Sequence, residues 1–145
     1  MLYKLYLFGR YFESKNIKLI SKLIYHFQKF LYNSSIPHST IIGKNCQFAY
    51  GGIGVVIHSK ARLGNNVMIG QGITIGGRGK GRGVPNIGNS VYIGPGARIL
   101  GGVRVGNNVV IAPNAVVINH VPDNTIVGGV PAKVLRDNID IGEYL

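Results

Sequence analysis

The 145-residue chain has one cysteine, no tryptophan and few acidic side chains, and these shortages limit the classes of protein it can belong to. Its one cysteine, Cys46, rules out a disulfide framework within the chain. No apolar run reaches the roughly 18 residues of a membrane-spanning helix, and no signal-peptide pattern stands out, so we expect a cytoplasmic protein. No cluster of histidine, cysteine and aspartate has the spacing of metal ligands, and we therefore predict no metal site.

Acidic residues are absent from Ser14 to Pro122. Over the whole chain, 16 Lys and Arg stand against 5 Asp and Glu, which gives a formal net charge of +11. Such a positive field attracts nucleic acid, an acidic membrane surface or a polyanionic small molecule. We disfavour nucleic acid because no binding motif is present. The phosphates of coenzyme A would suit the charge equally well.

Apolar residues recur every six positions along most of the chain, and we call this repeat the beat. Twelve positions keep this beat, with two longer steps: Ile42, Phe48, Ile57, Leu63, Ile69, Ile75, Ile87, Ile93, Ile99, Val105, Ile111 and Val117. A period of six is neither that of a plain strand nor that of a helix. It predicts short strands separated by sharp corners, winding as a solenoid around a column filled by the periodic side chains.

Residues at fixed offsets from the beat support the corners. Asn45, Asn66 and Asn108 each stand three positions after a beat residue, where a turning chain needs a left-handed conformation that Asn tolerates. Four positions after the beat comes a small or β-branched side chain, and Cys46 holds one of these inward positions. We therefore interpret Cys46 as a small buried apolar residue rather than a nucleophile.

The beat is interrupted twice. The step from Phe48 to Ile57 is nine residues, around a glycine-rich stretch, and the step from Ile75 to Ile87 is twelve. The second gap, residues 76–86, lacks aliphatic side chains except Val84 and carries Arg78, Lys80 and Arg82. We predict that it leaves the column as a loop, and loops on a rigid scaffold are where function usually lies.

Residues 1–36 form a leader without the beat. We predict two helices, at about 3–12 and 17–32, joined by a turn at residues 14–16. One face of the second helix is apolar, built from Leu19, Ile20, Leu23, Ile24, Phe27, Phe30 and Leu31. We favour packing of this stripe on the end of the column or on a neighbouring subunit. The alternative is that the basic, aromatic leader rests on the inner face of a membrane.

Several motifs resemble those of the hexapeptide-repeat acyltransferases, in particular the serine acetyltransferase branch and its relatives that acetylate surface sugars. They are the stretches at residues 72–80, 85–87, 93–101 and 129–133. The resemblance implies a left-handed parallel β-helix over residues 37–136, followed by an acidic tail at 137–145. It also implies a homotrimer that takes an acetyl group from acetyl-CoA, with coenzyme A lying between two subunits.

Carried over by position, the resemblance assigns coenzyme A contacts to six residues: Gly77, Arg78, Pro95, Arg98, Pro113 and Lys133. Gly76 or Gly77 would offer a backbone N–H to the oxyanion of the reaction. Arginine and lysine suit phosphates, and glycine allows close approach of the backbone. Pro95 and Pro113 stand where family members often have alanine, and a proline has no N–H to donate.

The catalytic histidines of serine acetyltransferases are missing. The equivalent positions, near Ala49, Tyr50 and Gly51 and at Val84, hold neither aspartate nor histidine. Of the four histidines present, we choose His58 as the general base because it follows a beat residue at a corner close to the predicted loop. Tyr50 is the second candidate, as a hydrogen-bond donor. We expect structural or surface roles for the others, His26, His38 and His120.

The leading functional hypothesis is therefore an acetyl-CoA-dependent O-acetyltransferase whose acceptor is a hydroxyl of a surface-polysaccharide sugar or its precursor. Two alternatives stay open. One is a serine O-acetyltransferase with a rearranged site, and the other is a non-catalytic hexapeptide-repeat trimer. A carboxylate partner for His58 would have to come from the tail, from Asp137 or Asp140 of another subunit.

Overall fold

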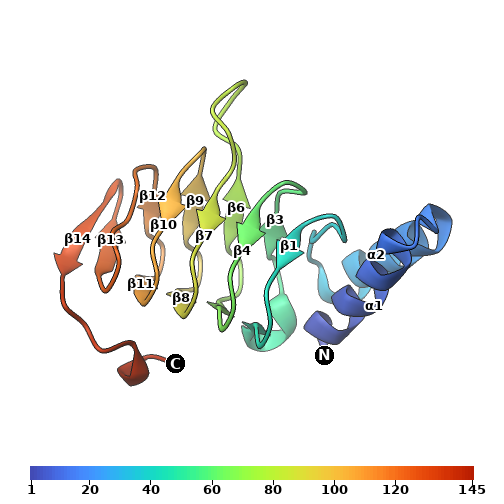
Figure 1. Cartoon of the computed structure of the whole chain (residues 1–145), viewed down its shortest axis with the longest axis horizontal. Helices are drawn as coiled ribbons and strands as arrows, with labels where there is room; N and C mark the ends of the chain where they lie inside the picture. The colour runs from blue at the N-terminus through green and yellow to red at the C-terminus, as the bar shows by residue number, and fades with distance from the viewer.

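The computed structural model describes residues 1–145 and shows a column of short strands with a helical hairpin at its N-terminal end (Figure 1). The hairpin comprises α1 (Leu2–Ser14) and α2 (Lys18–Tyr32). The column contains β1 (Ile41–Ile42), β2 (Gln47–Phe48), β3 (Val56–Ile57), β4 (Arg62–Leu63), β5 (Met68–Ile69), β6 (Thr74–Gly76), β7 (Asn86–Ile87), β8 (Val91–Ile93), β9 (Arg98–Leu100), β10 (Arg104–Val105), β11 (Val109–Ile111), β12 (Val116–Val117), β13 (Ile126–Gly129) and β14 (Ala132–Arg136). Two 3-10 helices, η1 (Ala49–Gly52) and η2 (Ile141–Glu143), complete the chain.

The strands form three sheets, each of which is one side of the column. The first face is β1-β4-β7-β10, the second β2-β5-β8-β11-β13-β14, and the third β3-β6-β9-β12. Up to β13, each strand pairs in parallel with the strand of the next coil. In this register residues of the beat stack on one another, as Ile57, Ile75 and Ile99 do on the third face. The predicted solenoid is confirmed as a three-sided parallel coil.

The core is the row of beat residues and their small inward neighbours, and all but Phe48 of the twelve are buried. The column begins earlier than predicted. Ser35 bridges to Val56 in parallel, and Ile36, six positions before Ile42, is completely buried. The backbone explains the extension, because Ser35 donates to the carbonyl oxygen of Val55 and accepts from the N–H of Ile57, both at 2.8 Å. Pro37, which follows, does not interrupt this bridge.

The predicted left-handed corners are present. Asn45, Asn66 and Asn108 have φ angles of 56°, 56° and 55°. The preceding residues form a ladder along the same edge, in which an Asn or Asp side-chain oxygen accepts a backbone N–H of the coil before it. These bonds join Lys44 to Asn65, Asn65 to Asn89, Asn89 to Asn107 and Asn107 to Asp123, each at 2.8 Å. The corners are thus held by side chains as well as by the strands.

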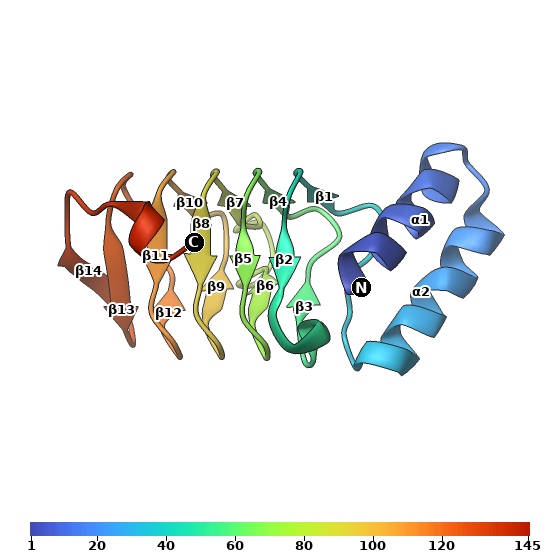
Figure 2. The ribbon, with the colours of Figure 1, turned by 90° about the horizontal axis from the view of Figure 1, so that it is seen from below.

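Both ends of the column are covered. At the C-terminal end, β14 turns back antiparallel on β13, as expected for a segment that leaves the six-residue period. The tail then folds back along the second face, where Ile139 is buried and Leu145 lies near Gln47 and Met68 (Figure 2). At the other end, α1 packs against the first coil through the buried residues Leu2 and Tyr6.

The apolar stripe of α2 does not pack on the end of its own column, so that part of the prediction is wrong, and packing on a neighbouring subunit stays a prediction. The buried residues of α2 are Ser21 and Gln28, and the stripe points away from the column. Leu23 is 62% exposed and Phe30 is 87% exposed. The reason is a polar contact layer between the helices and the column. In this layer, the Gln28 side chain donates to the carbonyl oxygen of Ile36, and Tyr25 and Ser35 share a hydrogen bond of 2.7 Å.

His38 belongs to this layer, which corrects the expectation of a surface role. It is buried, its Nδ1 lies 3.0 Å from the Ser21 hydroxyl, and burial lowers the pKa of its imidazole. Its ring packs directly on Gly9 of α1, where any Cβ would overlap the imidazole. His38 therefore fixes the hairpin to the column.

Candidate active site

One row of corners gathers most of the chemistry-bearing residues. We call it the loop corner: residues 58–61, 77–85, 101–103 and 118–120, where the chain passes from the third face to the first. Because the coils stack in parallel, these four segments follow one another along the column axis. The second segment is the predicted loop, and it projects clear of the column (Figure 1). The loop prediction is confirmed.

Two glycines of the third segment hold the loop. The N–H of Gly101 donates to the carbonyl oxygen of Gly76 at 2.9 Å, and the N–H of Gly102 donates to that of Arg82. Gly101 has φ +85°, and a Cβ there would come within 3.3 Å of the Arg78 Cβ. At Gly102 a Cβ would lie 2.8 Å from the Arg82 carbonyl oxygen. The absence of side chains therefore lets both ends of the loop pack on this corner.

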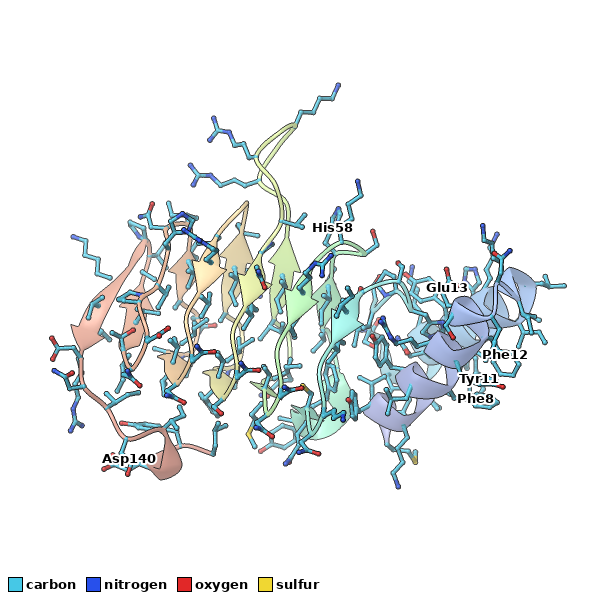
Figure 3. All side chains as sticks on the ribbon, in the orientation of Figure 1. Phe8, Tyr11, Phe12, Glu13, His58 and Asp140 are labelled. Atoms are coloured by element: carbon cyan, nitrogen blue, oxygen red, sulfur yellow. The ribbon has the colours of Figure 1, made fainter.

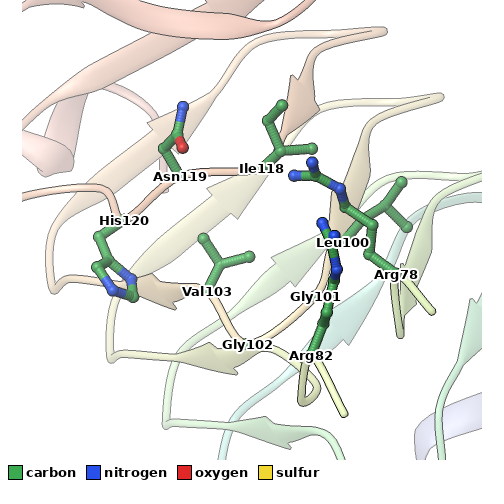
Figure 4. Close-up of a pocket in the computed structure, with 9 residues that line it drawn as sticks. All are labelled: Arg78, Arg82, Leu100, Gly101, Gly102, Val103, Ile118, Asn119 and His120. Atoms are coloured by element: carbon green, nitrogen blue, oxygen red, sulfur yellow. The ribbon is translucent and has the colours of Figure 1, made fainter. Parts of the chain in front are cut away.

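The result is an open cleft of about 290 Å³ between the loop and the next two coils (Figure 4). It is lined by Arg78, Arg82, Leu100, Gly101, Gly102, Val103, Ile118, Asn119 and His120. No carboxylate lines it, so the two guanidinium groups make it strongly positive. Such a cleft suits a phosphorylated ligand, since guanidinium groups bind phosphate oxygens in pairs.

His120 lies in this cleft, although we expected it to be structural. Its Nδ1 accepts the backbone N–H of Arg104 at 2.9 Å. A neutral imidazole whose Nδ1 accepts carries its proton on Nε2, so Nε2 is a hydrogen-bond donor. The sequence held a signal that we missed: His120 stands three positions after the beat residue Val117, as Lys60 does after Ile57. Arg82, the other charged cleft residue besides Arg78, was not among the predicted site residues, although it stood in the predicted loop.

His58 is at the loop corner as well, exposed and in the coil before the loop. Its Nδ1 accepts the N–H of Lys60 at 3.1 Å, so its neutral ring also carries the proton on Nε2. Three coils separate it from His120, which corresponds to about 14 Å at the spacing of paired strands. One reacting acyl group can therefore touch only one of these two histidines within a chain.

Tyr50 does not join His58. It lies in η1, at the corner between the second and third faces, with φ +49° and 78% of its surface exposed. Asp140 of the tail accepts from the N–H of Gly142, and it lies on the opposite side of the column from His58 (Figure 3). Asp140 of the same chain is therefore not a partner of His58, and the contact with Asp137 or Asp140 of another subunit stays a prediction.

The predicted coenzyme A contacts fall into three groups. Gly76, Gly77 and Arg78 belong to the loop and its base, at one edge of the third face. The other edge holds three more: Pro95, Arg98 and Pro113. The Arg98 guanidinium is occupied there, because it donates to the carbonyl oxygens of Gly72 and Gly96 in adjacent coils. Lys133 is exposed on β14 of the second face, apart from both groups.

The repeats match a known family model. Residues 85–119 fit the one described as bacterial transferase hexapeptide (six repeats). Over these residues the coils are similar to the hexapeptide repeats of bacterial transferases. Solved structures with this architecture include the serine acetyltransferase of Neisseria gonorrhoeae, with a TM-score of 0.89 and 30% identity over 96% of this chain and 54% of that one. This similarity supports the left-handed winding predicted for the column.

Relatives in sequence point the same way. The serine acetyltransferase of Bacillus pumilus (strain SAFR-032) is 33% identical over 88% of this chain and 59% of its own length. That of Staphylococcus xylosus is 36% identical, over 83% and 56% respectively. A serine acetyltransferase solved as a complex with CoA has a TM-score of 0.85 and 30% identity, over 92% of this chain and 55% of that one. The chain thus spans between half and two thirds of these relatives. They favour the serine alternative, and none supports a polysaccharide acceptor.

Proposed function

We propose that this chain transfers the acetyl group of acetyl-CoA to a hydroxyl, with serine as the leading acceptor and the loop corner as the site. The observation that carries the proposal is the cleft lined by Arg78, Arg82 and His120. It lies on a chain similar over most of its length to proteins named serine acetyltransferases. No metal is needed for this chemistry, and no group of histidine, cysteine and acidic side chains is arranged to hold one.

The cleft offers complementary surfaces for the donor. Arg78 and Arg82 would pair with its phosphates, and the apolar side chains of Leu100 and Ile118 would contact its thiol arm. The nucleotide end of the donor, rather than its thiol arm, would extend across the third face toward the corner of Pro95 and Pro113, so that the thioester stays beside His120. Those two residues present carbonyl groups and surface but no N–H donor.

The reaction needs a donor to the oxyanion and an acceptor for the hydroxyl proton. When the hydroxyl oxygen attacks the thioester carbon, Nε2–H of His120 can donate to the oxygen that becomes negative. The C–S bond then breaks and the thiolate of coenzyme A leaves. We assign the proton acceptor to His58 of a neighbouring subunit in a homotrimer, because within one chain it is too far from His120. To accept, His58 must release the Lys60 N–H and shift its own proton to Nδ1.

A second function is favoured by one observation. The places that the resemblance matches to the two histidines of serine acetyltransferases lie near Gly51 and at Val84 here. Gly51 has φ +69°, a conformation in which a histidine would be strained, so this corner is not built for the missing side chain. A non-catalytic trimer that binds coenzyme A without turning it over would explain both positions. A sugar acceptor, which needs no amino-acid site, would also explain them.

A thiol-release assay separates these readings. The purified protein is mixed with acetyl-CoA and with serine, nucleotide sugars or oligosaccharides in turn. We expect release with serine. Release with sugars alone would return the acceptor to a surface polysaccharide, and the absence of release with every acceptor would favour the non-catalytic trimer. Light scattering of the same sample gives the mass, and a monomer would contradict the assignment of His58 to a neighbouring subunit.

Calorimetry tests the donor site independently of turnover. Because a charge-assisted contact contributes on the order of 1.5–3 kcal/mol, Arg82→Ala should weaken coenzyme A binding about tenfold or more. Arg136→Ala removes the same charge from the exposed part of β14 and serves as the control. Equal affinities of the two variants would remove the cleft from the donor site.

A further inference from the structure

The helical hairpin turns its apolar surface outward. At about 100° per residue, the buried side of α2, marked by Ser21 and Gln28, and the centre of the apolar stripe lie roughly 120° apart around the helix axis. The stripe therefore faces solvent. The exposed apolar residues of both helices form what we call the outer hairpin face: Leu7, Phe8, Tyr11, Leu19, Ile20, Leu23, Phe27, Phe30 and Leu31.

The same hairpin carries a concentrated positive charge. All five of its lysines are exposed: Lys4, Lys15, Lys18, Lys22 and Lys29. Its arginine, Arg10, is turned inward, where it donates to the carbonyl oxygens of His38 and Thr40. The only acid is Glu13, which is half-buried. The outer hairpin face is thus accompanied by cations with almost nothing to neutralise them.

We propose that the outer hairpin face binds an anionic lipid surface, with α2 lying in the plane of the interface. Lysines beside exposed phenylalanine and leucine side chains on a short helix are the pattern of helices that rest on membranes. Charge decides between this occupant and a second copy of the chain. Two such hairpins packed together would gather ten lysines with only two acidic residues among them, whereas anionic headgroups attract all five lysines of each hairpin. Neither helix is both long and apolar enough to cross a bilayer.

The placement of the hairpin leaves the candidate site free. The hairpin covers the N-terminal end of the column, whereas the loop projects from its side (Figures 1 and 2). A membrane against the outer hairpin face would therefore not cover the cleft at the loop corner. The inference does not depend on the proposed transferase activity.

Cosedimentation with vesicles tests the proposal on the full chain. The probes are vesicles of phosphatidylcholine alone and of phosphatidylcholine with an equal part of phosphatidylglycerol. We expect binding to the anionic vesicles only, weakening as salt is raised. Leu23→Ser with Phe30→Ser should weaken binding more than about tenfold because two anchors are lost. Lys22→Glu with Lys29→Glu should do the same through charge.

Matched controls carry the same changes at the other end of the column. Val130→Ser with Leu135→Ser alters exposed apolar residues, and Lys133→Glu with Arg136→Glu reverses two exposed charges. Both controls should bind as the unaltered chain does. Failure of that chain to sediment with anionic vesicles, or undiminished binding by Leu23→Ser with Phe30→Ser, would overturn the proposal. A third outcome would also overturn it: no vesicle binding, together with a smaller oligomer for Leu23→Ser with Phe30→Ser than for the unaltered chain. The outer hairpin face would then be a contact between copies of the chain.

Discussion

The loop is held by backbone bonds to a corner without side chains, and Gly102→Ala should release it. The added Cβ would lie 2.8 Å from the Arg82 carbonyl oxygen, too close for either atom to stay in place. The hydrogen bond from the Gly102 N–H to that oxygen would break. A backbone hydrogen bond contributes about 1 kcal/mol net, so the open state of the loop should become about fivefold more populated.

Trypsin measures this opening directly, because the loop contains Arg78, Lys80 and Arg82. When the loop opens and closes faster than it is cut, the cleavage rate follows the open population. We expect Gly102→Ala to be cut about fivefold faster within the loop. Gly76→Ala is the control, because its Cβ would meet nothing closer than a Thr74 methyl group at 3.8 Å. Equal cleavage rates for Gly102→Ala and the unaltered chain would refute the idea that this corner holds the loop.

Three further predictions concern buried groups. Ile99→Ala should lower the free energy of unfolding in urea by about 2–5 kcal/mol, whereas Val56→Ala, half-exposed on the same face, should change it little. Burial lowers the pKa of His38, so the unfolded chain binds the proton more readily. The stability that this histidine provides should be complete above the ordinary histidine pKa of 6.5 and decline as the pH falls below it, a slope absent from His38→Gln. Burial raises the pKa of the Cys46 thiol, so a thiol reagent at neutral pH should label it only in urea.

The column could be predicted from the sequence because its signal is local and repeated. A beat residue such as Ile99 must point inward, and the equivalent residues of the neighbouring coils must do the same. Asn66 marks a left-handed corner for the same reason. The start of the column was misplaced because Ile36 is one beat residue followed by Pro37, and a single position does not reveal a period. The bridge that begins the column, from Ser35 to Val56, depends on a contact between segments about twenty residues apart.

The orientation of the hairpin could not be predicted in this way. The pattern of Ile20, Leu23, Phe27 and Leu31 identifies an apolar face but not what covers it. The structure buries the polar side of α2 instead, because the Ser21 hydroxyl and the Gln28 amide find partners at His38 and Ile36. Those partners come from the chain that follows the helix. No periodicity within the helix reports them.

Only those candidate site residues that have a local sequence signal could be predicted. The loop and His58 were found from breaks in the beat, which are local. His120 was missed because it joins Arg78 and Arg82 only through the stacking of three successive coils. Counting each corner residue from its own beat residue would have aligned these segments. The same count separates Tyr50, which follows Phe48, from His58, which follows Ile57 on the next face.

The role of His120 can be tested through the ring nitrogen that its hydrogen bond to Arg104 leaves free. With Nδ1 occupied by the Arg104 N–H, the neutral ring offers a donor and no acceptor. A glutamine amide retains an N–H donor but is far too weak a base to take a proton at neutral pH. If turnover is found, His120→Gln should therefore keep more activity than His120→Ala. A general base would lose activity equally in both variants, with the pH profile flattened, and that outcome would show that His120 accepts a proton during the reaction.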